Sequence, residues 1–166
     1  MSSIGKLFAR TALLWTLALP TIGSAGPTAI VIHGGAGTIQ RANMSAEVEA
    51  QYRQTLTAAV SAGHQVLVRG GKSQDAVIAA ILVMEDSPLF SAARGAVLTN
   101  QGEAELDASI MLGENLNAGA VTGVKRVRNP ILLAERVMLA SPHVMLMGAG
   151  AEAFAKTQQL ALVDNA

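Results

Sequence analysis

Residues 95–111, GAVLTNQGEAELDASIM, decide the fold class of this chain. In the second half of this stretch, apolar residues at 106, 108 and 110 alternate with polar residues at 105, 107 and 109. A period of two is typical of a β-strand with one buried and one solvated face. Asn100-Gln101-Gly102 supplies turn residues between 95–99 and 105–111. We therefore predict a β-hairpin over residues 95–111.

Helices are predicted on both sides of this hairpin. Residues 45–69 have an amphipathic period with Ser45 as N-cap, and residues 74–85 form a second apolar helix capped by Ser73. After the hairpin, Asn129-Pro130 is typical of a helix start. The other expected elements are a buried strand at 28–32, strands at 119–125 and 144–147, and a helix from 151. We predict a mixed α/β (α+β) fold in which helices cover an antiparallel sheet.

The composition limits the classes of function. The chain has 166 residues, of which 51% are hydrophobic and 14% charged, and this suits one folded domain rather than a disordered chain. Lys+Arg and Asp+Glu both number 12, so net charge gives no attraction to nucleic acid. Cysteine is absent, which excludes disulfides, thiolate zinc sites and a cysteine nucleophile.

The first 25 residues are predicted to be a secretory signal peptide. Lys6 and Arg10 precede an apolar run at 12–19, and Gly23-Ser24-Ala25 offers small residues for cleavage. The alternative, a transmembrane anchor, needs about 20 apolar residues, roughly twice this run. We therefore expect a secreted or periplasmic protein, without membrane association after signal removal, in which residues 26–166 belong to one domain.

Two glycine-rich motifs follow predicted strands. Ile32-His33-Gly34-Gly35-Ala36-Gly37 lets backbone N–H groups approach an oxyanion without a Cβ in the way, although an ordinary tight turn has the same pattern. The Gly-x-Ser-x-Gly elbow that would make this an α/β-hydrolase motif is absent. The second motif, at residues 148–153, imitates a dinucleotide fingerprint, but its confirming acidic residue would fall beyond residue 166. The sequence therefore disfavours nucleotide binding.

Other polar residues have both a functional and a structural interpretation. Glu103, Glu105 and Asp107 could serve acid–base chemistry or a cation, but their alternation favours the wet face of the hairpin. His64 and His143 lie far from His33 in the sequence, without the spacing of metal ligands. We expect these two histidines to be structural and loop residues.

Several segments, taken together and in order, resemble one protein family. Residues 29–37, AIVIHGGAG, are similar to the opening strand of the plant-type L-asparaginases, also called isoaspartyl peptidases. The other similar segments are Ser87–Phe90, Arg94–Thr99, Glu105–Met111, Asn117–Val121, Arg128–Ile131, Ser141–Leu146 and Gly148–Glu152. The resemblance covers essentially all of residues 28–155.

The resemblance implies an N-terminal-nucleophile hydrolase with an αββα sandwich, of which residues 26–166 form the α-subunit half. Members are self-cleaving precursors, and a threonine freed at the start of the β subunit attacks asparagine or a β-aspartyl dipeptide to release aspartate. That threonine stands in a Gly-Thr-Val-Gly segment, which this sequence lacks. No catalytic residue is therefore expected in this chain, and the nucleophile is expected beyond Ala166. The implied partners are the missing β half, a second αβ unit in a dimer, and a small amide or dipeptide substrate.

Within this chain the resemblance implies supporting roles only. It places His33, Gly34, Gly35, Gly37 and Ser91 at the active site. It also implies no organic cofactor, but a structural sodium ion in a loop of main-chain carbonyls, for which an ordinary helix-to-strand loop is the alternative. The carbonyls belong to Met84, Glu85, Ser87, Phe90, Ala92 and Arg94.

Two departures from the family pattern bear on activity. After Phe90 the family has Asn-Ala-Gly, whereas this chain has Ser91-Ala92-Ala93, and after Met111 it has Asp-Gly, whereas this chain has Leu112-Gly113. Ser91 is shorter than asparagine and lacks its amide, and Ala93 resists torsions that glycine permits. These departures keep a second hypothesis open, namely a catalytically dead α-like chain that acts only as a binding or assembly partner.

Overall fold

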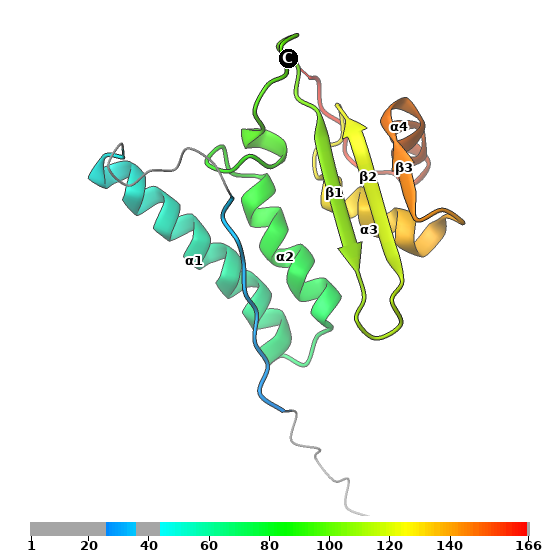
Figure 1. Ribbon diagram of the computed structural model, residues 1–166. Coiled ribbons are helices and arrows are strands. Elements are labelled where there is room, and N and C mark those ends of the chain that lie inside the picture. The colour runs from blue at the N-terminus through cyan, green and yellow to red at the C-terminus, as the bar shows by residue number, and fades with distance from the viewer. Residues whose placement is uncertain (1–25, 36–43, 166) are drawn as a thin grey trace, which may run out of the picture.

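The structure, a computed structural model, describes residues 26–35 and 44–165 and is mixed α/β, as predicted (Figure 1). In order, the elements are α1 (Ala46–Val68), α2 (Ser73–Glu85), the 3-10 helix η2 (Ala93–Gly95), β1 (Leu106–Met111), β2 (Ala118–Val124), α3 (Pro130–Ala140), β3 (Met145–Met147) and α4 (Gly148–Thr157). The expected signal peptide at residues 1–25 lies outside the described residues. Within the described ranges, no helix has the length and apolar character needed to span a membrane.

Local sequence explains where the helices begin. The Ser45 side chain caps α1 by accepting a hydrogen bond from the Val48 N–H at 3.3 Å. Helix α2 begins one residue earlier than predicted, at Ser73, and α3 begins at Asn129-Pro130 as predicted. Helix α4 begins at Gly148, three residues earlier than predicted, because the φ of 47° there turns the chain directly from β3 into the helix.

The sheet has three strands in the order β1-β2-β3. The strands predicted at 119–125 and 144–147 are confirmed as β2 and β3. Strands β1 and β2 are antiparallel, with Ile110 opposite Gly119 and Leu106 opposite Val124. Strand β3 joins β2 in parallel, so the sheet is mixed rather than wholly antiparallel. This order leaves one side of β1 as a sheet edge among the described strands.

The hairpin predicted over residues 95–111 is wrong in its first strand. Strand β1 pairs with β2 instead, and residues 95–99 contribute only the isolated bridge between Leu98 and Ala104. The turn itself is present, because the Thr99 N–H donates to the Glu103 carbonyl and Gly102 has a φ of 79°. A ladder does not extend from it because residues 93–95 coil into η2, immediately before the expected strand.

The buried strand predicted at residues 28–32 is also wrong. The segment has no assigned strand, and its main chain makes no hydrogen bond to another described residue. Its side chains alternate, with Ile30 and Ile32 half-buried and Val31 91% exposed. The segment crosses the α1–α2 pair (Figure 1), where a Cβ added to Gly63 would lie 2.4 Å from Ile30 Cδ1 and 2.6 Å from the Ala76 carbonyl oxygen. It therefore has the side-chain period of a strand without a ladder partner.

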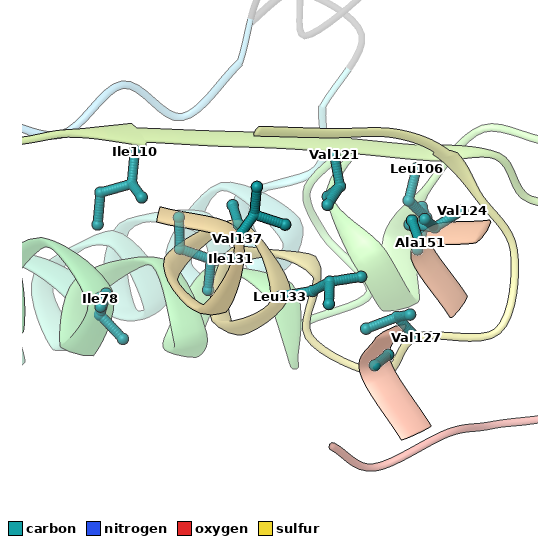
Figure 2. Packing of buried hydrophobic residues seen from close by; sticks show 12 residues of the cluster. Ile78, Leu106, Ile110, Val121, Val124, Val127, Ile131, Leu133, Val137 and Ala151 are labelled. Carbon is teal, nitrogen blue, oxygen red and sulfur yellow. The ribbon is translucent and has the colours of Figure 1, made fainter. Parts of the chain in front are cut away.

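The core lies between the sheet and α3. Ile131, Leu133 and Val137 of α3 are fully buried and belong to one cluster with Ile110 and Val121 of the sheet (Figure 2). A Cβ added to Gly119 would lie 2.1 Å from the Ala134 carbonyl oxygen, so β2 and α3 approach each other as closely as glycine permits. This close packing fixes the position of the sheet on α3.

The other face of the sheet is exposed. Helices α3 and α4 lie on one side of the sheet only (Figure 1). On the opposite face, Asp107 and Ser109 alternate along β1 with the buried residues, and Met111, Met145 and Met147 are 59%, 56% and 71% exposed. We call this surface, defined by these five residues, the open face.

Candidate active site

The glycine turn after residue 32 packs against the loop that carries Ser91. Gly35 has a φ of 117°, which only glycine adopts without strain. A Cβ added to Gly34 would lie 3.2 Å from Leu56 Cδ2 and 3.6 Å from Phe90 Cε1. Gly34, with His33 and Gly35 on either side of it in the chain, is thereby placed next to Phe90, whereas the predicted site residue Gly37 lies outside the described residues.

Phe90 is the anchor that joins these two segments. Its side chain is 3% exposed, and its ring packs edge-on against Tyr52 of α1 with a centroid separation of 5.7 Å and an interplanar angle of 85°. Ser91 follows immediately and is exposed. Two segments about 57 residues apart in sequence therefore meet at one place, which sequence spacing does not reveal.

A cavity of about 310 Å³ lies between the strand-like segment 28–32 and α2. Its lining is mostly apolar and includes Ile30, Ile32 and His33 from one side and Met84 and Ala92 from the other. One residue predicted to support the active site, His33, and two of those predicted for the sodium loop, Met84 and Ala92, thus border one cavity.

The predicted sodium loop, residues 84–94, curls through a chain of short-range hydrogen bonds. The carbonyl of Met84 accepts from the Ser87 N–H, that of Phe90 from Ala92, and that of Ala92 from Gly95. No group of three or more His, Asp and Glu side chains in the described residues could hold a metal ion. Main-chain carbonyl oxygen is a donor type that suits a hard cation.

Two further observations bear on whether this loop fits a cation. A Cβ added to Gly95 would lie 2.2 Å from the Phe90 carbonyl oxygen and 2.8 Å from that of Pro88, so two carbonyls converge on this glycine. The Glu85 side chain also has one buried oxygen, Oε2, without a partner among the described residues. Converging carbonyls and an unpaired carboxylate oxygen are both compatible with a bound cation.

Glu85 is a buried acid whose side chain was not predicted from the sequence to be functional, although its main-chain carbonyl was. It is 4% exposed at the end of α2, and its Oε1 accepts a hydrogen bond from the Ile131 N–H at the start of α3 at 3.0 Å. Burial raises the pKa of Glu85 to about 7, against the opposing hydrogen bonds from Ile131 and Asn129. The available signal in the sequence was a charged residue at the end of a predicted helix that is otherwise mostly apolar.

The expected departure at Ala93 has a structural consequence. Ala93 has a φ of 43°, in the left-handed region that glycine adopts freely and alanine does not. The glycine that the resemblance implies at this position is thus replaced by a residue that strains the backbone directly after Ser91 and Ala92.

The carboxylates of the hairpin region have structural partners. Lys125 Nζ lies 2.6 Å from Glu103 Oε2 and 3.2 Å from Glu105 Oε1. Asp107 Oδ1 accepts hydrogen bonds from the Thr122 hydroxyl and the Gly123 N–H, and these bonds lower the pKa of Asp107. These contacts support the prediction that the three acids belong to the solvated face of this β-structure rather than to a catalytic or cation site.

The acid of the second glycine motif is also engaged in the fold. Glu152 Oε1 accepts hydrogen bonds from the N–H groups of Lys125 and Arg126 at 2.7 and 3.0 Å. Glu152 therefore ties α4 to the end of β2. This contact gives the motif a role in packing.

The described residues form a mixed α/β fold with a three-stranded sheet, which is consistent with part of an N-terminal-nucleophile hydrolase fold. The model of the protein family described as asparaginase matches residues 26–166 of this sequence. The chain therefore belongs to that family.

Individual relatives agree with this assignment. The chain is 50% identical to an isoaspartyl peptidase of Salmonella typhimurium over 135 residues, which are 81% of this chain and 43% of that protein. It is 49% identical to an isoaspartyl peptidase of Escherichia coli over 78% of this chain and 40% of that protein. It is 47% identical to a plant-type L-asparaginase of Pyrococcus abyssi over 77% of this chain and 40% of that protein. The matched part thus spans about two-fifths of the length of these relatives.

Proposed function

We propose that this chain is the α-subunit part of a threonine-type isoaspartyl peptidase/L-asparaginase, made as a self-cleaving precursor. The identity of 49–50% to two proteins named isoaspartyl peptidase, over 78–81% of this chain, carries the proposal. The packing of the glycine turn against the Ser91 loop supports it, because the resemblance assigns both segments to the active site.

In the proposed reaction, the threonine hydroxyl of a β half attacks the side-chain amide carbonyl of asparagine, or the isopeptide carbonyl of a β-aspartyl dipeptide. The α-amine of the same threonine takes the hydroxyl proton and returns it to the leaving amine. Ammonia or an amino acid departs, and water then hydrolyses the aspartyl ester to free aspartate and the threonine hydroxyl. His33, Gly34 and Gly35 would support the oxyanion region, and Ser91 would help to orient the nucleophile.

The experiment compares the chain with and without a β half that begins at threonine. We expect no release of ammonia from asparagine, or of aspartate from a β-aspartyl dipeptide, by residues 26–166 alone. Co-expression with the β half should produce turnover, and Ser91→Asn should increase it by restoring an amide. Turnover by residues 26–166 alone, above a boiled control, would contradict the proposal. Absence of turnover in every combination would favour the inactive assembly partner instead.

The open face and the strand-like segment 28–32 support the proposed partner. Exposed methionines on a sheet face, and a segment with strand period but no ladder partner, are surfaces that further β-structure can cover. We propose that the β half covers them and that two αβ units form a dimer. Size-exclusion chromatography with light scattering on the co-expressed halves tests this stoichiometry, and a stable αβ monomer would contradict the dimer.

We also propose a structural sodium ion in the loop of residues 84–94, with no organic cofactor. The main-chain carbonyls of Met84, Glu85, Ser87, Phe90, Ala92 and Arg94 would hold it, and Glu85 Oε2 would add negative potential nearby. Replacing sodium chloride by choline chloride at equal ionic strength should lower the melting temperature of the assembled protein. An unchanged melting temperature would contradict a structural sodium site.

We also propose that the protein is exported, and the sequence of residues 1–25 supports this. Lys6, Arg10 and the apolar run that follows are typical of a signal peptide. We expect material recovered outside the cytoplasm to begin after Ala25. Mass spectrometry that finds Met1 on such material would contradict export by cleavage.

A further inference from the structure

The glycine turn that follows residues 28–32 rests on side chains of α1. A Cβ added to Gly34 would lie 3.2 Å from Leu56 Cδ2 and 3.6 Å from Leu56 Cδ1. It would also lie 3.6 Å from Phe90 Cε1, and the Phe90 ring packs edge-on against Tyr52. Because Tyr52 and Leu56 are four residues apart on α1, their side chains lie on the same face of the helix. We call the side chains of Tyr52, Leu56 and Phe90 the platform of the turn.

A second contact fixes the direction in which this segment lies on α1. Ile30 Cδ1 lies against Gly63, whereas Gly34 lies against Leu56. An extended chain covers about 13 Å from residue 30 to residue 34, and a helix covers about 10 Å from residue 63 back to residue 56. The segment therefore runs opposite to the direction of α1, and Leu56 marks the place where the glycine turn meets the helix.

Gly34 and Gly35 lack a side chain for different reasons. Gly35 has a φ of 117°, in the left-handed region, whereas the φ of Gly34 lies outside that region, so its backbone accepts alanine. The obstacle to a Cβ at residue 34 is Leu56, because 3.2 Å is shorter than the optimal separation of two carbon atoms, about 3.5–4.0 Å. Leu56 thus sets how closely the main chain of the turn approaches α1.

This contact bears on the proposed hydrolase activity, on which the inference rests. The resemblance assigns His33, Gly34 and Gly35 to the active site, and donors to an oxyanion act only when they are held at hydrogen-bond distance from it. A misplacement of about 1 Å can lower a rate about 100-fold. We propose that Leu56 is a positioning residue for this reaction. Together with Phe90, which Tyr52 braces, it holds the glycine turn at the distance from α1 at which the turn supports the oxyanion.

The test is a double-mutant cycle in the protein assembled with a β half, with a β-aspartyl dipeptide as substrate. Gly34→Ala should lower kcat at least about tenfold and change KM less than about threefold, because its methyl group pushes the turn away from Leu56. Leu56→Ala should lower kcat about threefold to tenfold, because the turn loses its support. The two changes combined should give a kcat at least about fivefold above that of Gly34→Ala, because the methyl group then occupies space that Leu56 has left.

Leu67→Ala is the matched control. Leu67, like Leu56, is a half-buried leucine of α1, and the two are about 16 Å apart along the helix. Leu67→Ala should lower the melting temperature about as much as Leu56→Ala does, but it should leave kcat within about twofold of the parent. This comparison separates positioning from a general loss of stability. Leu56→Val, which removes the Cδ atoms with a smaller loss of packing, takes the place of Leu56→Ala if that variant does not fold.

A second readout does not use activity. In assembled protein labelled with ¹⁵N-glycine, the amide signals of Gly34 and Gly35 report the position of the turn, and Gly34→Ala identifies the signal of Gly34. Leu56→Ala should shift both signals, whereas Leu67→Ala should leave both in place.

Three results would overturn the proposal. These are a combined variant no faster than Gly34→Ala, a kcat in Leu67→Ala as low as in Leu56→Ala, and unshifted signals of Gly34 and Gly35 in Leu56→Ala. An assembled parent without turnover would reject the proposed function instead. In that case shifted glycine signals would still establish Leu56 as the support of the turn, and unshifted signals would reject that role as well.

Discussion

Residues 28–32 and the β1–β2 pair both have the side-chain period of a β-strand, yet their surroundings differ. The amides and carbonyls of β1 and β2 are joined in an antiparallel ladder, and α3 covers one face. Residues 28–32 lie extended on α1 and α2 with no main-chain hydrogen bond to a described residue. Val121 of β2 is 1% exposed, whereas Val31 is 91% exposed.

This difference shows that an alternation of buried and exposed side chains is not sufficient to form a β-strand. A strand requires a neighbour for its N–H and C=O groups, and β1 finds that neighbour only 7 residues further along the chain. Residues 28–32 have no such neighbour close in sequence. A ladder partner for them would have to come from a distant segment or from another chain.

The largest expected effect concerns the unpaired surfaces as a whole. We expect residues 26–166 expressed alone to aggregate or to form a molten state, because the open face and residues 28–32 are uncovered. Co-expression with a β half should give soluble protein in which the amides of residues 28–32 become protected from hydrogen exchange. Size-exclusion chromatography and hydrogen exchange measure both effects. A monomer that melts cooperatively without a β half would refute this expectation.

The next largest effect concerns Glu85, whose side chain at the end of α2 accepts a hydrogen bond from the Ile131 N–H at the start of α3. Because burial raises its pKa from 4.5 to about 7, the folded protein binds a proton that the unfolded chain has released. The resulting contribution to stability is fully present below about pH 4.5 and is lost as the pH rises through about 7, by up to about 3 kcal/mol.

Comparison with Glu85→Gln isolates this contribution, because glutamine does not titrate and still accepts from the Ile131 N–H. Urea unfolding of the soluble protein between pH 4.5 and 8 should show the parent losing stability relative to the variant. Parallel pH curves for the two proteins would mean that Glu85 titrates normally.

A matched pair of valine substitutions compares the two strand-like regions directly. Val121→Ala should lower the free energy of unfolding by about 2 kcal/mol, because it removes two buried methyl groups and leaves a cavity. Val31→Ala should change it by less than about 0.5 kcal/mol while residues 28–32 are unpaired. Urea denaturation measures both. If a β half covers residues 28–32, the loss in free energy of unfolding caused by Val31→Ala should rise toward the loss caused by Val121→Ala. Equal losses for the two variants without a β half would contradict the comparison.

The smallest effect concerns the loop between the two regions. Ala93→Gly should stabilise the protein by about 0.5–1 kcal/mol, because relief of the φ of 43° outweighs the extra entropy of glycine in the unfolded chain. Ala92→Gly is the matched control: φ is −147° there, so glycine should destabilise by about 0.5–1 kcal/mol. Thermal unfolding of both variants gives the signs, and a destabilising Ala93→Gly would show that residue 93 is not strained.

Much of the fold could be predicted from sequence because its signals are local. The cap at Ser45, the Asn129-Pro130 helix start and the alternation in residues 106–111 each act over a few residues, and the corresponding elements formed. The errors concerned pairing. Alternation identified β1 but not its partner, which is β2 rather than residues 95–99.

The candidate site was predictable only in part, for the same reason. Family resemblance singled out the glycine turn and Ser91, but their meeting point at Phe90 and Tyr52 depends on how the segments pack. The Glu85 side chain was not singled out, because its significance lies in its burial and in an oxygen that lacks a partner among the described residues.

The sequence by itself determined the helices, the strand period of β1 and β2, the glycines at turns and the membership of a family. These follow from propensities and patterns that act between residues near each other along the chain. Only the tertiary structure decided that β1 pairs with β2, that Val31 is left exposed, and that Glu85 is buried beside Ile131 with one oxygen unpaired. The physical reason is that hydrogen-bond pairing and burial depend on groups brought together from distant parts of the chain.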